Sequence, residues 1–373
     1  MKLNKTFLTL GLAATLLQMP TSSFAQNAGG NRQNPLLVKS SLPFGAPDFS
    51  KIQESDYLPA FEAGIKEQRA NIQKIISNKK KPTFQNTILA YENSGMLLDR
   101  VSNVFFGLTS AHKTPGIAEA QKKVMPLLTD LDNEISFNQK LFERIKYVYD
   151  HEYSKLKGED KRLTEVIYKG FVRSGALLSP EKMERMKQIN TRISDLQEQF
   201  GNLLPAATNN AVGWVKSKEE LAGLSDADIA QCKKDAESLG NKAPYCIVIV
   251  NTTQQAILTN LQNRELRRKV YMASIHRADG TDPKFNTFPI VTEIAKLRAE
   301  KGQLMGYSTY ADYSLEKTMA KNAKNVNCFL QSLIKEYAPK ADAETREIEA
   351  YAQKSEGKDF KLQPYDRFYY SAK

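Results

Sequence analysis

The chain has 373 residues, of which 41% are hydrophobic and 25% are charged, and its formal net charge is +11 at pH 7. A chain of this length can bury a sizeable core and can form two lobes. Its basic residues are mixed with acidic ones along the whole sequence, whereas a nucleic-acid-binding protein gathers them on one element with aromatic residues between them. The composition therefore excludes no enzyme class but does not favour nucleic-acid binding.

Residues 1–25 have the three parts of a secretory signal peptide. Two lysines stand within the first five residues, an apolar run covers 7–17, and Ser23-Phe24-Ala25 provides a small-x-small cleavage site. The run is too short to span a bilayer, and no Cys follows it for lipid attachment. We therefore expect cleavage near Ala25 and export to a bacterial periplasm. Cleavage removes two lysines and no acidic residue, so the net charge falls from +11 to +9.

Helical periodicity dominates the rest of the chain. Residues 26–40 are predicted to form a flexible N-terminal linker. Apolar residues at spacings of three and four then mark a first helix over 58–76 and a second over 82–108, with Thr83 as the expected cap. Gly95 lowers the helix propensity of the second stretch without breaking its pattern. The basic run NKKKP between the two stretches is expected to be a loop.

Two prolines punctuate the next part of the chain. Pro126 should kink or restart the helix that contains it. Pro180 occupies the first position of a long predicted helix, with Ser179 as its N-cap. The apolar stripe of that helix consists of Met183, Met186, Ile189, Ile193, Leu196 and Phe200.

The exception to the helical pattern lies in the middle of the sequence. The β-branched runs 211–217 and 245–251 predict two short strands. Between them lies a small helix with Ser225 as its cap and Asp228 in the capping-box position. Helical periodicity then resumes almost to the end of the chain. The predicted fold is therefore mainly α with one small β element (about 211–217 and 245–251), within a helical body over 41–373.

Three cysteines, Cys232, Cys246 and Cys328, are too few for a disulfide framework, and an odd number leaves at least one thiol free. Cys246 lies in the apolar run YCIVIV. None of the three has a neighbour at a metal-ligand spacing, so all three are predicted to be small core residues.

The segment HEYSK, His151 to Lys155, begins like the zinc-peptidase signature H-E-x-x-H. In that signature two histidines one helical turn apart bind the ion, and the glutamate between them is the base. Lys155 stands where the second histidine is needed, and its ammonium has no lone pair to give. His151 also falls at the predicted C-terminal end of a helix, where a protonated imidazole interacts favourably with the helix dipole. We therefore interpret His151 and Glu152 as structural residues.

No other motif in the chain predicts a catalytic centre. His112 and His276 are the remaining histidines, and no two of the three are three or four residues apart. The sequence has no G-x-S-x-G nucleophile motif and no P-loop. Its acidic residues occur in patterns typical of solvated helix faces, and the aromatic cluster at 365–373 is typical of a helix core. The motifs thus predict no catalytic, cofactor-binding or metal-binding residue.

Five longer blocks give a different indication. In chain order they are PTFQNTILAYENSGMLLDRVSNVF, FVRSGALLSPEKMERMKQIN, NRELRRKVYMASIHRADG, IAKLRAEKGQLMGYSTYADYSLEKTMAK and LQPYDRFYYSAK. Together they resemble the thimet oligopeptidase family of zinc metallopeptidases, and within it the peptidyl-dipeptidase (Dcp-type) branch. The resemblance implies a two-lobed helical clamshell with a channel for short peptides, a catalytic H-E-x-x-H helix, and zinc that activates water. In that branch, dipeptides are released from the C-terminus of the substrate.

The resemblance covers only the N-terminal half of that family. The zinc helix of the family lies downstream of the block that ends at Lys373. The zinc ligands, the general base and the substrate-binding tyrosines and histidines are therefore expected beyond this chain, and no catalytic residue carries over. The leading hypothesis is a truncated or split peptidyl-dipeptidase that is inactive alone, with short oligopeptides as substrates and a complementing C-terminal half as a possible partner.

Two alternatives remain open. A non-catalytic helical peptide-binding protein of the periplasm would be a cooperatively unfolding monomer with affinity for oligopeptides, whereas a fragment would expose apolar surface. A basic protein that binds membranes or nucleic acid has only its net charge in its favour.

Overall fold

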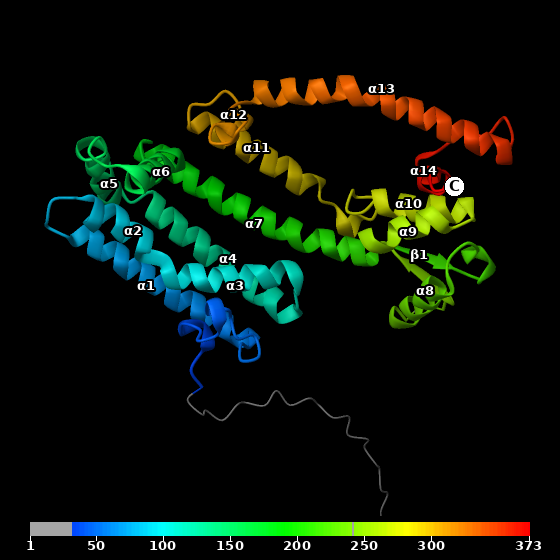
Figure 1. Ribbon diagram of the computed structural model, residues 1–373. Coiled ribbons are helices and arrows are strands. Elements are labelled where there is room, and N and C mark those ends of the chain that lie inside the picture. The colour runs from blue at the N-terminus through cyan, green and yellow to red at the C-terminus, as the bar shows by residue number, and fades with distance from the viewer. Residues whose placement is uncertain (1–31, 241) are drawn as a thin grey trace, which may run out of the picture.

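The computed structural model describes residues 32–240 and 242–373, and the fold is mainly α-helical, as predicted (Figure 1). The predicted signal peptide lies outside the described residues. The α-helices are α1 (Tyr57–Ser77), α2 (Ala90–Glu92), α3 (Met96–Ala111), α4 (Pro115–Ser136), α5 (Gln139–His151), α6 (Gly158–Ser174), α7 (Pro180–Asn210), α8 (Asp226–Ser238), α9 (Asn251–Asn260), α10 (Arg264–Ile275), α11 (Phe288–Leu304), α12 (Tyr310–Leu315), α13 (Ala323–Glu356) and α14 (Arg367–Ser371). The strands are β1 (Val212–Val215) and β2 (Tyr245–Val248). Within the described part of the chain, the structure contains no helix that is both long and apolar enough to cross a membrane.

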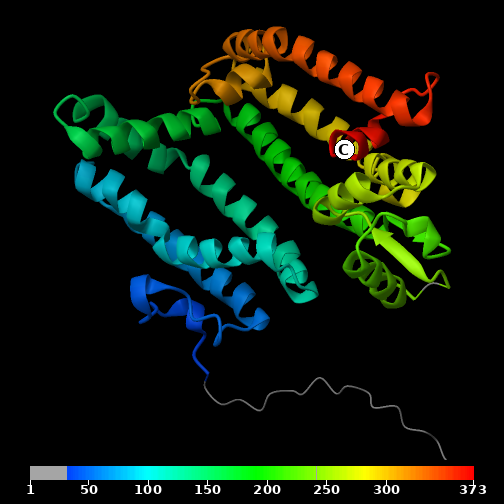
Figure 2. The same cartoon turned by 45° about the vertical axis from the view of Figure 1, so that its right-hand side comes forward.

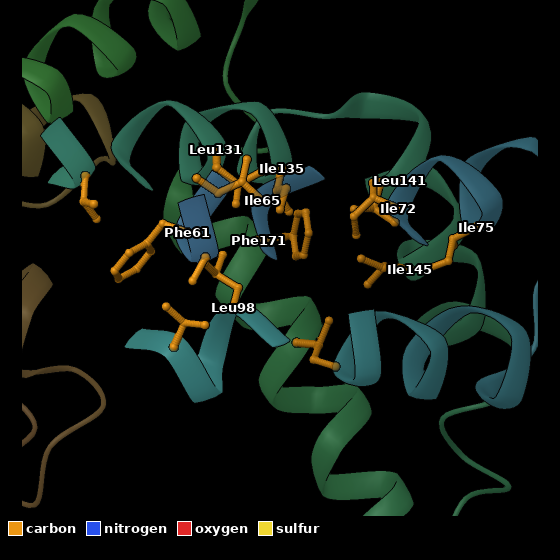
Figure 3. Close-up of a cluster of buried hydrophobic side chains, with 14 of the residues drawn as sticks. Phe61, Ile65, Ile72, Ile75, Leu98, Leu131, Ile135, Leu141, Ile145 and Phe171 are labelled. Atoms are coloured by element: carbon orange, nitrogen blue, oxygen red, sulfur yellow. The ribbon is translucent and has the colours of Figure 1, made fainter. Parts of the chain in front are cut away.

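A first group of helices, α1 to α6, encloses the largest core of the molecule. Figure 3 shows Phe61 and Ile65 of α1 beside Leu131 and Ile135 of α4 and Phe171 of α6. Each of these side chains is buried, and they come from helices spread over more than a hundred residues of sequence. The amphipathic stripes predicted from the sequence therefore meet in one well-packed cluster.

A second, smaller group consists of α8, α9, α10 and the two strands. The strands pair antiparallel, with Val212 opposite Val248 and Val215 opposite Tyr245. Their apolar side chains share a separate core with those of α8, α9 and α10. The two predicted strands are thus confirmed, with shorter bounds, and Asn251 at the end of the second predicted run is instead the first residue of α9.

Helix α7 connects the two groups (Figures 1 and 2). Its 31 residues give it a length of about 46 Å at 1.5 Å per residue. Helices α4 and α11 lie alongside it. Two ion pairs fasten α11 to α7, Arg185 to Glu300 and Arg192 to Glu293, each with an N–O distance of 2.6 Å.

The last part of the chain leaves α7 after α11 and returns to the second group. After α11 and the short α12, helix α13 runs for 34 residues along the outside of the molecule, and α14 returns to the second group beside α10 (Figures 1 and 2). Helix α13 contacts α12 at one end and α14 at the other. Of its 34 residues, Ala352 alone is buried.

The predicted N-caps at Ser179 and Ser225 form as expected, whereas the Asp228 side chain bonds to the Ser225 hydroxyl and not, as in a capping box, to its backbone N–H. The Ser179 hydroxyl accepts the N–H of Lys182, with Pro180 in the first helical turn. The Ser225 hydroxyl accepts the N–H of Asp228 at 3.1 Å and donates to the Asp228 carboxylate at 2.6 Å. These short-range signals depend only on residues three apart, so the sequence alone predicts them.

One detail of the helical prediction is wrong. The stretch 82–108 is divided into a π-helical turn η4 (Phe84–Leu89), α2, a 3-10 turn at Asn93–Gly95 and α3. At the break, Gly95 lies against α1: a Cβ on Gly95 would lie 2.8 Å from the side chain of Gln68. At Pro126, where a kink or a restart is predicted, helix α4 continues without a restart, and the kink stays a prediction.

Residues 32–40 belong to the stretch for which a flexible linker is predicted. In the structure they carry a 3-10 turn at Pro35–Leu37, and Leu36 is buried in the first core. Arg32 forms an ion pair with Asp56 at 2.7 Å, and the Asn34 amide donates to the Asp56 carbonyl at 2.8 Å. These contacts fasten residues 32–36 to the start of α1.

Candidate functional site

His151, the last residue of α5, is exposed and has only local partners. Its Nδ1 lies 2.9 Å from the carbonyl oxygen of Tyr147, and its ring stacks on the Tyr147 ring with 4.1 Å between centroids. The Glu152 carboxylate accepts the N–H of Phe84 at 3.0 Å, at the start of η4. Lys155 is exposed. The carboxylate therefore caps a neighbouring helical turn, which is a structural role.

The other two histidines also lie at helix ends. His112 follows α3 and is exposed. His276 follows α10, and its Nδ1 lies 2.6 Å from the Asp279 carboxylate. The hydrogen bond to His276, with further hydrogen bonds from Thr281, lowers the pKa of Asp279 to about 2. This pair closes the turn after α10.

The cysteines divide into two kinds. Cys232 in α8 and Cys246 in β2 are buried, as predicted, and burial raises the pKa of each thiol to about 11. Cys328 in α13 is exposed. The prediction of a core residue is therefore wrong for Cys328, because the described part of the chain places no element over that face of α13.

A cleft of about 370 Å³ lies between α4, α7 and α11 and contains a partly buried lysine. Burial lowers the pKa of Lys301 from its ordinary value. Its Nζ donates to the Asn190 side chain at 2.8 Å, and the Asn190 amide donates to the Asn133 side chain at 3.0 Å. The network joins three helices by polar contacts, so it explains how α11 is held rather than identifying a reacting group.

The strongest buried charge cluster joins α10 to the end of the chain. Asp366 is fully buried and accepts hydrogen bonds from Arg264 at 2.7 Å and from Arg267 at 3.1 Å. Arg267 is itself 1% exposed and also donates to the Leu261 carbonyl oxygen at 2.7 Å, while its guanidinium lies over the Tyr369 ring at 4.1 Å. The hydrogen bond to Asp366 raises the pKa of Arg264. This cluster anchors residues 360–373, and it lies within two sequence blocks that carry the family resemblance.

The most unusual surface is the apolar face of α13, which we define by Val326, Phe329, Leu330, Leu333, Ile334 and Tyr337. Their spacing of three and four residues places all six on one side of the helix. The five from Phe329 onward expose between 37% and 69% of their surface. Such a stripe is normally buried in a core or an interface. This stripe is the feature that a search for catalytic residues overlooks, although its periodicity is visible in the sequence.

A zinc site requires three or four convergent His, Cys, Asp or Glu ligands. Across residues 32–240 and 242–373, no group of three such side chains comes together. The residues that the structure describes therefore do not fit the zinc that the family resemblance implies.

Fold and surfaces together define a mainly helical protein in which the long helix α13, near the C-terminus, has most of its surface exposed. Comparison with known proteins shows which family it is similar to. Residues 257–373 match the model of peptidase family M3. The chain is 35% identical over 339 residues to "Dipeptidyl carboxypeptidase" of Escherichia coli (strain K12), a match that covers 91% of this chain and 50% of the relative.

Similar matches extend to other members. The chain is 30% identical over 347 residues to "Oligopeptidase A" of the same organism, again with 91% of this chain and 50% of the relative covered. It is 26% identical over 318 residues to "Mitochondrial intermediate peptidase" of Vanderwaltozyma polyspora, a match that covers 80% of this chain and 39% of the relative. The chain is thus similar to members of peptidase family M3, and it spans about half the length of the curated bacterial relatives that it matches.

Proposed function

We propose that this chain is the N-terminal half of an M3-type zinc peptidase that hydrolyses short peptides and releases dipeptides from their C-termini. The observation that carries the proposal is the match to a dipeptidyl carboxypeptidase over 91% of this chain but only 50% of the relative. We place the zinc ligands and the general base in the other half, because this chain has three histidines and no H-E-x-x-H sequence.

The role of this half is to provide a framework. Its own buried side chains build two larger helical cores joined by α7. A third, small cluster packs Leu304 of α11 against Met183 and Met186 of α7. Because the described residues offer no zinc site, we assign no step of the hydrolysis to them. Export to the periplasm, directed by residues 1–25 and with cleavage near Ala25, is part of the same proposal.

The alternative is a helical protein that binds peptides without cleaving them. The absence of an H-E-x-x-H sequence favours it. The exposed apolar face of α13 weighs against it, because a protein that functions alone rarely leaves such a stripe uncovered. We therefore keep the peptidase as the preferred function.

The test compares the full chain alone with the same chain produced together with the half of E. coli dipeptidyl carboxypeptidase that the match leaves uncovered. Release of dipeptides from a peptide of eight residues with a free C-terminus is measured with and without Zn²⁺. We expect no release by the chain alone and zinc-dependent release by the pair. Zinc-dependent dipeptide release by the pure chain would contradict the proposed division between the two halves, and tight peptide binding without cleavage by either sample would favour the alternative.

A further inference from the structure

We propose that the apolar face of α13 is the docking surface for the other half of the M3 unit. The proposal rests on the proposed function, and it goes further by assigning the contact to Val326, Phe329, Leu330, Leu333, Ile334 and Tyr337. These six residues cover three turns of α13, from its first turn to the residues just before Pro339.

The size of the face is that of an interface. Five large side chains with exposed fractions of 37% to 69% present roughly 500 Å² of apolar surface, if each offers about 200 Å² when fully exposed. This exceeds the scattered apolar exposure of ordinary monomers. It is also more than half of the roughly 800 Å² that one partner contributes to a standard protein–protein interface.

The face is held in a fixed position. The carboxylate of Asp312 in α12 accepts the N–H of Ala323 at 3.2 Å, so the start of α13 is tied to α12. At the other end, α13 packs on α14, which follows the buried Asp366–Arg264–Arg267 cluster. A helix that is anchored at both ends and bare between them is preorganised for docking, which lowers the entropic cost of association.

Three observations select the other half of the M3 unit as the occupant. Helix α13 lies within residues 257–373, the segment that matches the family model, so its face belongs to the unit that the family shares. The bacterial relatives contain about twice as much chain as the matched region. A second copy of this chain is disfavoured by charge, because each copy has a net charge of +11, or +9 once residues 1–25 are removed, and like charges oppose association.

The experiment measures capture. The full chain with an affinity tag is co-expressed with the half of E. coli dipeptidyl carboxypeptidase that the match leaves uncovered, and the captured half is quantified. The double variant L333E/I334E places two carboxylates in the face. The control K335E changes the net charge by the same amount, but Lys335 lies on the opposite side of the helix from the centre of the face. Low reactivity of the buried thiols of Cys232 and Cys246 shows that each variant is folded.

We expect capture in near-equal amounts by the wild-type chain and by K335E, and at least a tenfold loss with L333E/I334E. The proposal is overturned if the wild-type chain captures none of the half, including the case where the half remains insoluble beside it, or if L333E/I334E captures as much as K335E. It is also overturned if sedimentation shows a homodimer, sensitive to L333E/I334E, that the half does not displace. A further test uses vesicles of phosphatidylglycerol and phosphatidylethanolamine. If L333E/I334E loses binding to these vesicles but keeps capture of the other half, the face binds a lipid surface and the proposal is overturned as well.

The two proposals fail in different ways. Capture that depends on the α13 face but yields no peptide hydrolysis supports the docking surface and contradicts the peptidase. Hydrolysis by a pair whose assembly is insensitive to L333E/I334E supports the peptidase and contradicts the docking surface.

Discussion

The substitution Asp366→Ala is expected to destabilise the second helical group by about 3–5 kcal/mol. Asp366 is fully buried and accepts hydrogen bonds from two guanidinium groups, those of Arg264 and Arg267. Arg264 keeps 43% of its side chain exposed and can regain water, whereas Arg267, with 1% exposed, cannot. Removal of the carboxylate therefore leaves one positive charge buried without a counter-charge.

The size of this loss follows from what remains after the substitution. Arg267 still donates to the carbonyl oxygens of Leu261 and Gln262 at 2.7 and 3.0 Å, so its hydrogen bonds are only partly lost. Its net charge is not compensated, and an uncompensated buried charge is the costly part of a broken buried ion pair. Asp366 also accepts the N–H of Gln363 at 3.1 Å, and the loss of such a cap adds about 1 kcal/mol.

The assay is urea unfolding followed by the fluorescence of Trp214, the single tryptophan of the chain. Trp214 lies in β1, which contacts α10, so its emission reports on the group that contains Arg267. With a urea dependence of 1–3 kcal/mol per molar, the expected loss lowers the midpoint by about 1 M or more. The matched control is Glu265→Gln, which breaks an exposed pair with Arg268 on the same helix, and exposed pairs contribute little. Equal midpoints for D366A and E265Q would refute the reasoning.

Three further predictions follow from the described contacts. Gly64→Ala should destabilise the first group by about 1–3 kcal/mol, because the new Cβ would lie 3.0 Å from the backbone of α3; Gly107→Ala, which meets open space, should raise the urea midpoint slightly. At pH 8 a maleimide should label the exposed thiol of Cys328 at least a hundredfold faster than that of Cys232, whose pKa is raised to about 11, and equal rates in mass spectrometry would show that α8 is open. The Asp279 carboxylate, with its pKa lowered to about 2, should remain ionised at pH 3 in an NMR titration. Its stabilising effect should be complete above pH 4 and disappear as the pH falls through 2; an Asp279 titration near pH 4 would contradict the ion pair with the His ring.

The features that the sequence predicts correctly are local. The caps at Ser179 and Ser225 depend on side chains three residues apart, and the stripes of α1 and α7 depend on a regular spacing. The features it does not predict depend on distant residues. At the break before α3, Gly95 lies against the side chain of Gln68 from another helix, and the ion pair of Arg267 with Asp366 joins residues 99 positions apart.

Helix α13 is an instructive intermediate case. Its apolar spacing from Val326 to Tyr337 predicts a buried face by the same rule that succeeds for α1. In α1 the corresponding residues, such as Phe61 and Ile65, are buried, whereas the face of α13 is exposed. The rule identifies the face that requires a partner, but it contains no information on whether that partner lies within the same chain.

The contacts of HEYSK in the structure weigh against a metal site at this segment. A histidine at the end of α5 points its Nδ1 to the carbonyl oxygen of Tyr147, one turn earlier in the same helix, and Glu152 is already occupied by the N–H of Phe84. Metal binding at this position would therefore break two existing contacts and would find a lysine in place of the second ligand. A short motif match thus has less predictive weight than the contacts already made by its members.

Anchoring and docking on α13 should be thermodynamically linked. A partner that binds only the folded form stabilises it in proportion to the logarithm of its concentration relative to its dissociation constant. The Asp366 cluster holds α14, and α14 holds the end of α13, so D366A should weaken capture of the other half even though no residue of the docking face is changed. Because the face itself remains intact in D366A, excess partner should restore part of the stability that this variant loses. The same excess of partner should not raise the stability of L333E/I334E, because that variant lacks the contact. That difference separates a residue that positions α13 from the residues that make the contact.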